Sequence, residues 1–241
     1  MSQNNFDILP QSTVEASHQC WSCGDMRAAL FCDSCGRLQP AAPTDYFTFF
    51  GLPRQLNLDL AQLEREYYRL SRRLHPDLYA SATPQEKEWS LQKTSQLNDA
   101  YRTLREPVAR TEYLLKLEGL YREEASADGA KQKPAAPPEL LAEVFELNMQ
   151  LEELRMNRTA GGQDADLERD LAEQEAGFSA KLDAVDHELR GLWTAWDFAA
   201  ASPAADAAEA RKRAADAMLA LLNRRNYLRN LVRDVREALA G

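Results

Sequence analysis

The sequence predicts an all-α protein that carries a small metal knuckle near its N-terminus. Apolar residues recur at helical spacing through residues 44–118 and 138–240, and no strand-like alternation of any length appears among them. All four cysteines fall within residues 20–40, a stretch too short to build a core of its own. We therefore expect a helical fold preceded by a segment that metal binding orders.

The composition narrows the function classes. The chain has 241 residues, of which 44% are hydrophobic and 28% charged, as expected for a protein of one or two folded domains. Its net charge of -9 and pI near 5.0 argue against a nucleic-acid-binding protein. No apolar run approaches the roughly 20 residues of a membrane span. The N-terminus resembles neither a secretory signal nor a transit peptide, so we expect a cytoplasmic protein. The Ala-rich, Arg-over-Lys composition of the C-terminal half favours a bacterial source. A mitochondrial matrix protein that has lost its transit peptide is the alternative.

Breaks in the helical pattern divide the chain into five segments. Glycine and proline between residues 119 and 137 predict a linker, and Gly161-Gly162 and Pro203 separate three C-terminal helices. The expected segments are a disordered polar tail (1–19), a tetracysteine segment (20–40), a four-helix region (44–118), the linker (119–137) and a three-helix region (138–241).

The four cysteines form two CxxC pairs, each followed by glycine: Cys20 with Cys23, and Cys32 with Cys35. Two thiolates on one tight turn can reach a single tetrahedral ion, and glycine permits the left-handed backbone that turns amides toward sulfur. We predict one structural zinc ion per chain, because protein ligands fill all four positions. Two disulfides are the alternative, which a reducing compartment disfavours. His18 could replace a cysteine, but we expect it to face solvent.

The three residues His75, Pro76 and Asp77 lie between two helical stretches. Proline ends the first stretch and restricts His75 to extended geometry, so Asp77 should stand at a fixed position on an exposed loop. A histidine that only contacts the dipole of a helix end is the alternative. Helix, His-Pro-Asp loop and helix are the signature of a J-domain, the module by which co-chaperones trigger ATP hydrolysis in DnaK-type chaperones.

The helix before this loop has two contrasting faces at about 100° per residue. Its apolar face is formed by Leu60, Leu63, Tyr67, Leu70 and Leu74, and the expected partner face on the next helix by Leu97, Ala100, Tyr101 and Leu104. The opposite face is formed by Arg65, Arg69, Arg72 and Arg73. A solvated face is the simplest interpretation of such a row. In an acidic chain, however, a positive patch beside the loop favours electrostatic steering toward an acidic partner.

Four stretches resemble the HscB-type J-protein family of iron–sulfur cluster assembly, over about residues 44–240. They are DYFTFFGLP at Asp45–Pro53, LSRRLHPDLYAS, LNDAYRTLREPVARTEYLLKLEG and PPELLAEVFEL. The Asp-Tyr-Phe opening and the run at Pro107–Leu115 separate this family from generic J-proteins, and some members also carry a tetracysteine segment. The resemblance implies an L-shaped co-chaperone. Its J-domain would engage a DnaK/HscA-type chaperone, and its C-terminal three-helix bundle would hold an IscU-type iron–sulfur scaffold.

The helix from Pro138 to Met156 has two apolar faces. One is the expected core stripe of Leu140, Val144, Leu147, Leu151 and Leu154. A bundle cannot bury the second face as well, so that face either packs under the J-domain or is exposed for a partner. The resemblance favours the partner, and by position it implies a scaffold-binding patch of Leu141, Ala142, Phe145, Glu146, Met149 and Tyr227, the last lying off the core stripe of the final helix.

Three other functions are less consistent with the sequence. A general J-protein acting on misfolded clients would need a Gly/Phe-rich linker or a β-rich client-binding domain. A zinc-knuckle nucleic-acid module would need more basic residues than Arg27 and Arg37 near the cysteines. An enzyme would need paired carboxylates, a Cys-His set or a phosphate loop, none of which can be defended. We therefore expect an adaptor without catalytic chemistry of its own.

Overall fold

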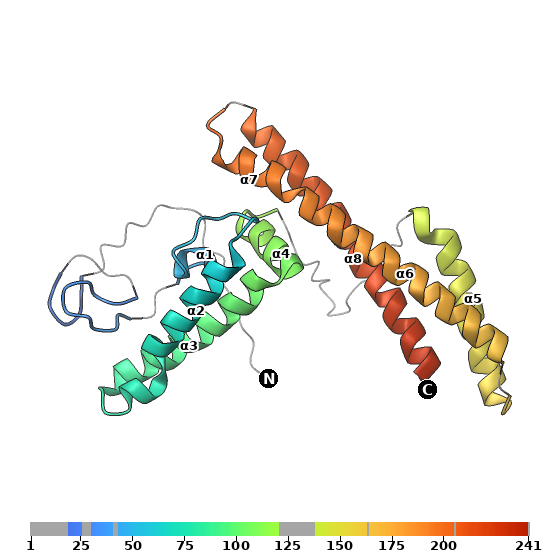
Figure 1. Cartoon of the computed structure of the whole chain (residues 1–241), viewed down its shortest axis with the longest axis horizontal. Coiled ribbons are helices and arrows are strands. Elements are labelled where there is room, and N and C mark those ends of the chain that lie inside the picture. The colour runs from blue at the N-terminus through green and yellow to red at the C-terminus, as the bar shows by residue number, and fades with distance from the viewer. Residues whose placement is uncertain are drawn as a thin grey trace. The chain divides into compact units, whose positions relative to one another are not determined.

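The computed structural model describes residues 19–25, 30–40, 43–120, 138–162, 164–204 and 206–240. Every regular element within these ranges is helical apart from an isolated antiparallel bridge between Phe31 and Leu38, so the predicted all-α fold class is confirmed (Figure 1). Nearly all of the predicted tail, His18 and most of the predicted linker lie outside the described residues. None of the described helices is both long and apolar enough to span a bilayer.

The helical boundaries follow the proline and glycine breaks. The elements before the predicted linker are α1 (Tyr46–Phe49), α2 (Leu60–Leu74), the 3-10 helix η1 (Pro76–Tyr79), α3 (Pro84–Arg105) and α4 (Pro107–Leu117). Those after it are the 3-10 helix η2 (Pro138–Leu140), α5 (Leu141–Thr159), α6 (Ala165–Gly191), α7 (Trp193–Ala201) and α8 (Ala207–Ala240). Pro107 occupies the first turn of α4, where its missing N–H has no intrahelical acceptor in any case.

The structure divides into two compact units. The first joins the tetracysteine segment, up to Thr44, to Glu66–Asp99, which holds the loop end of the α2–α3 hairpin. The second joins Asp45–Arg65 to the chain from Ala100 onward, which holds α4 and the C-terminal helices.

The predicted apolar faces of α2 and α3 are largely buried. The buried members are Leu63, Leu70, Leu74, Leu97, Ala100 and Leu104, and Tyr67 and Tyr101 are half-buried. Leu60 departs from the prediction because its side chain is 45% exposed. It is the first residue of α2, where fewer neighbouring side chains surround it than in the middle of the helix.

The predicted three-helix bundle is formed by α5, α6 and α8, and α7 continues α6 after a single-residue break at Leu192. The predicted stripe of α5 lies in the bundle core, with Val144 partly buried at its edge. The core residues are Leu140, Leu147, Leu151, Leu154, Leu167, Leu171, Phe178, Val185, Leu228, Leu231, Val232 and Val235. Their spacing of three, four or seven residues within each helix is the pattern expected of helices packed side by side.

Polar contacts join α7 to α4 and to the loop before α2. Trp193 Nε1 donates to Thr111 Oγ1 at 3.1 Å, and the Arg110 guanidinium lies 4.7 Å from the centroid of the Trp193 ring. The Asp197 carboxylate accepts the N–H groups of Leu56 at 2.7 Å and Asn57 at 2.9 Å. The two tryptophans of α7, Trp193 and Trp196, are buried.

Candidate functional site

Each CxxC pair lies on a tight turn, and the two turns repeat the same backbone geometry. The Gly24 N–H donates to the Cys20 carbonyl at 2.9 Å, and the Gly36 N–H donates to the Cys32 carbonyl at 2.8 Å. The two glycines have φ of 77° and 71°, a left-handed conformation that other residues adopt only with strain. The glycine that follows each cysteine pair is therefore required by the turn itself.

These two turns bring all four thiols together. The sulfur atoms lie within 4.8 Å of one another, with Cys20 Sγ 3.6 Å from Cys35 Sγ and Cys23 Sγ 3.6 Å from Cys32 Sγ. Four thiolates around a tetrahedral ion at about 2.3 Å would be roughly 3.8 Å apart. A disulfide would need a sulfur separation near 2.05 Å, and all four cysteines are free. The cluster therefore fits one metal ion and does not fit the alternative of two disulfides.

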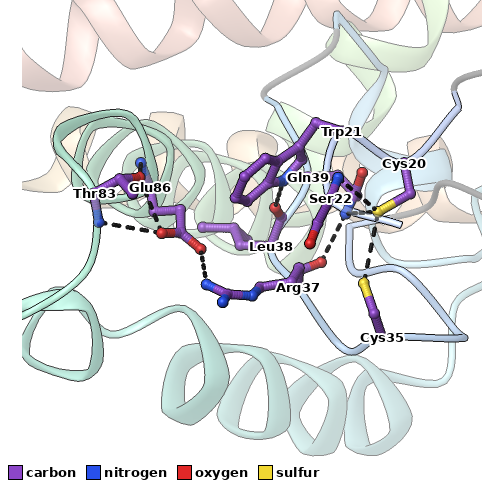
Figure 2. A network of polar contacts seen from close by, with 9 residues as sticks. All are labelled: Cys20, Trp21, Ser22, Cys35, Arg37, Leu38, Gln39, Thr83 and Glu86. Atoms are coloured by element: carbon purple, nitrogen blue, oxygen red, sulfur yellow. Dashed lines mark hydrogen bonds and ion pairs between the residues drawn. The ribbon is translucent and has the colours of Figure 1, made fainter. Parts of the chain in front are cut away.

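Hydrogen bonds prepare the Cys20 sulfur to act as a thiolate. Burial alone would raise its pKa, but bonds from the Cys23 and Ser22 N–H groups, and further bonds from Cys35 and Gln39, lower the pKa of Cys20 to about 6. The Gln39 amide nitrogen lies 3.4 Å from Cys20 Sγ (Figure 2). Gln39 is 3% exposed and was not identified from the sequence. The sequence did contain a signal for this role, because Gln39 is a polar residue that closely follows the second cysteine pair. Metal ligands are commonly oriented by hydrogen bonds from such polar neighbours.

The His-Pro-Asp loop has the predicted geometry. Helix α2 ends at Leu74, His75 has φ of -55° and ψ of 128°, and Pro76 opens the 3-10 helix η1. The Asp77 side chain is 90% exposed and the His75 side chain 55% exposed. The Asp77 N–H donates to His75 Nδ1 at 3.3 Å, which holds the two side chains on the same short turn. The loop thus presents a fixed carboxylate to solvent.

The base of this loop is tied to α3. Ser90 Oγ and Thr94 Oγ1 donate to the Leu74 carbonyl at 2.6 Å and 3.1 Å. That carbonyl belongs to the last turn of α2, where no N–H of the same helix can reach it. The two hydroxyl groups replace the missing helical partner and fix the point from which the loop departs.

All four arginines of the predicted positive row are exposed, but acids neutralise part of the row. Arg69 Nε lies 2.7 Å from Glu66 Oε2, and Arg65 Nη2 lies 3.9 Å from Asp59 Oδ2. Arg72 Nε donates to the Tyr68 carbonyl, and Arg73 stacks on an aromatic ring. The net positive potential beside the loop is therefore weaker than four free arginines would give.

The second apolar face of α5 is exposed. Leu141 is 54%, Phe145 68% and Met149 59% exposed, and Ala142 and Glu146 are exposed beside them. This face of α5 therefore lies outside the core of its own bundle.

Tyr227 differs from the other members of the predicted patch. Its side chain is partly buried and packs against the bundle core. Burial raises its pKa, with a further contribution from Asp234. Tyr227 therefore lies at the edge of the bundle core and is less exposed than Leu141, Phe145 and Met149.

Comparison with known proteins identifies a domain family that matches the J-domain and relatives that match most of the chain. Residues 45–113 match the DnaJ domain family. The iron-sulfur cluster co-chaperone protein HscB of Mus musculus is 34% identical over 186 residues, which cover 75% of this chain and 72% of that protein. The co-chaperone protein HscB homolog of Cupriavidus taiwanensis is 35% identical over 150 residues, which cover 61% of this chain and 82% of that protein. The matched region is shorter in the Arabidopsis thaliana homolog, where it covers 53% of the protein.

Two solved structures share the fold. The crystal structure of human co-chaperone protein HscB has a TM-score of 0.60 at 24% identity, covering 91% of this chain and 98% of that chain. Chaperone HscB from Vibrio cholerae has a TM-score of 0.53 at 26% identity, covering 80% of this chain and 96% of that chain.

Proposed function

The chain belongs to the HscB family of co-chaperones, and we propose that it delivers an IscU-type iron–sulfur scaffold to a DnaK/HscA-type chaperone. It holds the scaffold on its C-terminal bundle and stimulates the chaperone's ATPase through the His-Pro-Asp loop. The single observation that carries this proposal is the exposed, rigid His75-Pro76-Asp77 turn at the end of a packed helical hairpin. In this function the protein acts by binding and positioning two partners, and it performs no catalytic step of its own.

The chaperone contact depends on a few exposed groups. The Asp77 carboxylate is 90% exposed, so a partner can reach it and donate hydrogen bonds to it. The exposed arginines of α2 add a local positive field in a chain of net charge -9, which speeds encounter with an acidic surface. Arg65 and Arg69 contribute less than Arg72, because they already face acids within the chain.

The scaffold contact depends on the exposed face of α5. Three large apolar side chains one turn apart, at Leu141, Phe145 and Met149, form a stripe that water covers in the free protein. Burying such a stripe against a partner is favourable, and aromatic anchors commonly supply much of the binding free energy. Glu146 adds an exposed charge beside the stripe that helps to fix orientation.

The metal in this proposal is zinc, held by the four cysteines in a closed structural site. Four sulfur ligands favour zinc or an iron–sulfur centre over the hard cations magnesium and calcium. The protein works in the bacterial cytoplasm, or in the mitochondrial matrix if a transit peptide has been removed.

The proposal is tested with variants of the loop in the full chain. His75→Gln and Asp77→Asn should each abolish stimulation of a DnaK-type chaperone's ATPase. They should keep the wild-type melting temperature, because exposed substitutions usually change stability by less than about 0.5 kcal/mol. Asp166→Asn, which changes an 83% exposed carboxylate on α6, is the matched control and should stimulate normally. Full stimulation by the Asp77→Asn protein contradicts the proposal. Equal stimulation with an unfolded client in place of the scaffold indicates a general J-protein instead.

A further inference from the structure

The second cysteine turn contacts the first turn of α3. Arg37 Nη1 lies 2.9 Å from Glu86 Oε1, and the Glu86 side chain is only 3% exposed. Glu86 Oε2 accepts bonds from the N–H and the hydroxyl of Thr83 at 3.1 Å and 2.9 Å, and the Glu86 N–H donates to Thr83 Oγ1 at 3.2 Å. This reciprocal arrangement is the capping box that begins a helix. Arg37 therefore binds the carboxylate that fixes the start of α3 (Figure 2).

The Glu86 carboxylate is charged as well as buried. Burial alone would raise its pKa, but the hydrogen bonds from Thr83 and the ion pair with Arg37 lower the pKa of Glu86 below its usual value. A buried charge that loses its cation is strongly unfavourable. The capping box consequently depends on an arginine that lies 49 residues earlier in the chain.

The same cysteine turn contacts the last turn of α2. Phe31 precedes Cys32 and pairs with Leu38 in the isolated bridge, and the Arg73 guanidinium carbon lies 3.8 Å from the centroid of its ring. The Arg73 carbonyl in turn accepts a bond from the Tyr79 hydroxyl at 3.1 Å, on the far side of the loop. Phe31 thus holds the helix end from which the His-Pro-Asp loop departs.

A hydrogen-bonded path links these contacts to the sulfur cluster. The Gln39 amide nitrogen donates to the Arg37 carbonyl at 2.8 Å and contacts Cys20 Sγ at 3.4 Å. The Cys32 N–H also donates to the Arg37 carbonyl, at 2.9 Å. Figure 2 shows the path running from the Cys35 and Cys20 sulfurs through Gln39 and Arg37 to the α3 cap. Because so short a segment has little core, metal binding is what holds these groups in place.

We infer that Phe31 and Arg37 are positioning residues for the His-Pro-Asp loop. The second cysteine turn, ordered by the metal, contacts Arg73 before the loop through Phe31 and Glu86 after the loop through Arg37. These two contacts fix the loop in the conformation that engages the chaperone. A loop whose side chains are mostly exposed belongs to the least stable part of a fold. Restraining both of its ends lowers the entropy that is lost when a partner binds it. The inference rests on the proposed function for its effect on the chaperone, but the restraint itself is independent of any partner.

The restraint is tested by amide hydrogen exchange of the zinc-loaded full chain. The probes are the N–H groups of Leu78, Ala80 and Ala82, which donate to carbonyls within the loop. Arg37→Ala should speed their exchange roughly tenfold, which corresponds to about 1.4 kcal/mol, while the protein keeps one zinc ion per chain. Phe31→Ala should act in the same direction, and removal of zinc from the wild type by a chelator should have at least as large an effect.

Two further variants separate positioning from general stabilisation. Arg37→Lys retains the charge and should restore part of the protection. Arg54→Ala removes an arginine that binds another helix cap, because Arg54 Nη2 lies 2.9 Å from the Asp45 carboxylate at the start of α1. This matched control should leave loop exchange unchanged, since Asp45 is remote in sequence from residues 73–86 and caps a different helix.

Chaperone stimulation gives the second readout. Arg37→Ala should raise the concentration required for half-maximal ATPase stimulation several-fold, and Arg54→Ala should not. Unchanged loop exchange in zinc-loaded Arg37→Ala overturns the inference, as does faster exchange with unaltered stimulation. If the wild type itself does not stimulate, the proposed function fails, and exchange alone then decides whether the cysteine turn restrains the loop.

Discussion

Replacing Leu141 and Phe145 with alanine should weaken scaffold binding and leave the bundle folded. Phe145 is 68% exposed, so of the roughly 200 Å² that such a ring can bury, about 140 Å² faces water in the free protein. Covering that area fully would contribute about 3 kcal/mol as an upper limit, or roughly 100-fold in Kd. Partial cover is the rule at interfaces, so we expect the double variant to lose about tenfold or more.

The cost to folding should be limited, because more than half of each side chain is already exposed in the free protein. Only about 60 Å² of the Phe145 ring is buried in the free chain, which limits the contribution of this residue to the lost stability to about 1.5 kcal/mol. Leu147 lies on the opposite face of the same helix and is 1% exposed. Leu147→Ala should therefore cost about 2–5 kcal/mol by opening a cavity.

The assay combines thermal melts with titration of purified scaffold protein into each variant. Phe198→Ala is the matched control, because Phe198 is a 77% exposed phenylalanine on α7 and lies outside the α5 face. It should bind scaffold as the wild type does. A strongly destabilised Leu141→Ala/Phe145→Ala protein with unchanged scaffold affinity would refute the reasoning and would show that this face supports the fold.

Two predictions concern the first structural unit. Metal analysis of protein purified under reducing conditions should find one zinc ion per chain, and the Cys32→Ser variant should lose it. Zinc-free protein with an ordered tetracysteine segment would contradict the metal site. Lys93 is 3% exposed, and burial lowers the pKa of its ammonium group from 10.5 to about 8. Between about pH 8 and 10.5 this lysine is therefore protonated in the unfolded chain and neutral in the folded one. Because the unfolded chain binds more protons there, the free energy of unfolding rises with pH across that window. Lys93→Met should therefore raise the free energy of unfolding at pH 7 by about 1–3 kcal/mol in urea melts, with a smaller gain at pH 10. A loss of stability at pH 7 would show that the ammonium group is favourably bound.

The parts of the site that could be predicted from the sequence are those that local chemistry determines. The CxxC-Gly turns follow from metal-ligand spacing and from the left-handed backbone that glycine allows. The end of α2 at Leu74 follows from Pro76, and the core stripe of α5 follows from helical periodicity. Each of these signals lies within about 15 residues and needs no knowledge of distant contacts.

The parts that could not be predicted depend on pairing across the sequence. Thr83 and Glu86 have the spacing of a capping box, which is a visible signal. Nothing in that spacing indicates that Arg37 completes the ion pair. The partial burial of Tyr227 could not be predicted for a related reason, since a residue at the border of a helical stripe is buried or exposed according to how the neighbouring helices pack around it. Periodicity gives the direction of a side chain but not the extent of the surface that meets it.

The run at Pro107–Leu115, which carries part of the family resemblance, lies in an internal interface of the structure. Arg110 is 2% exposed and donates to the Leu104 carbonyl at 2.5 Å, and its guanidinium stacks on Trp193. Thr111 is fully buried and accepts the Trp193 indole N–H. These residues therefore join α4 to α7 and are not available to a chaperone or a scaffold. Both side chains also have partners within the J-domain, because Arg110 donates to the Leu104 carbonyl and Thr111 Oγ1 donates to the Pro107 carbonyl at 2.9 Å. The contacts with Trp193 add to these bonds. The run therefore supplies the α4 side of an internal interface with α7.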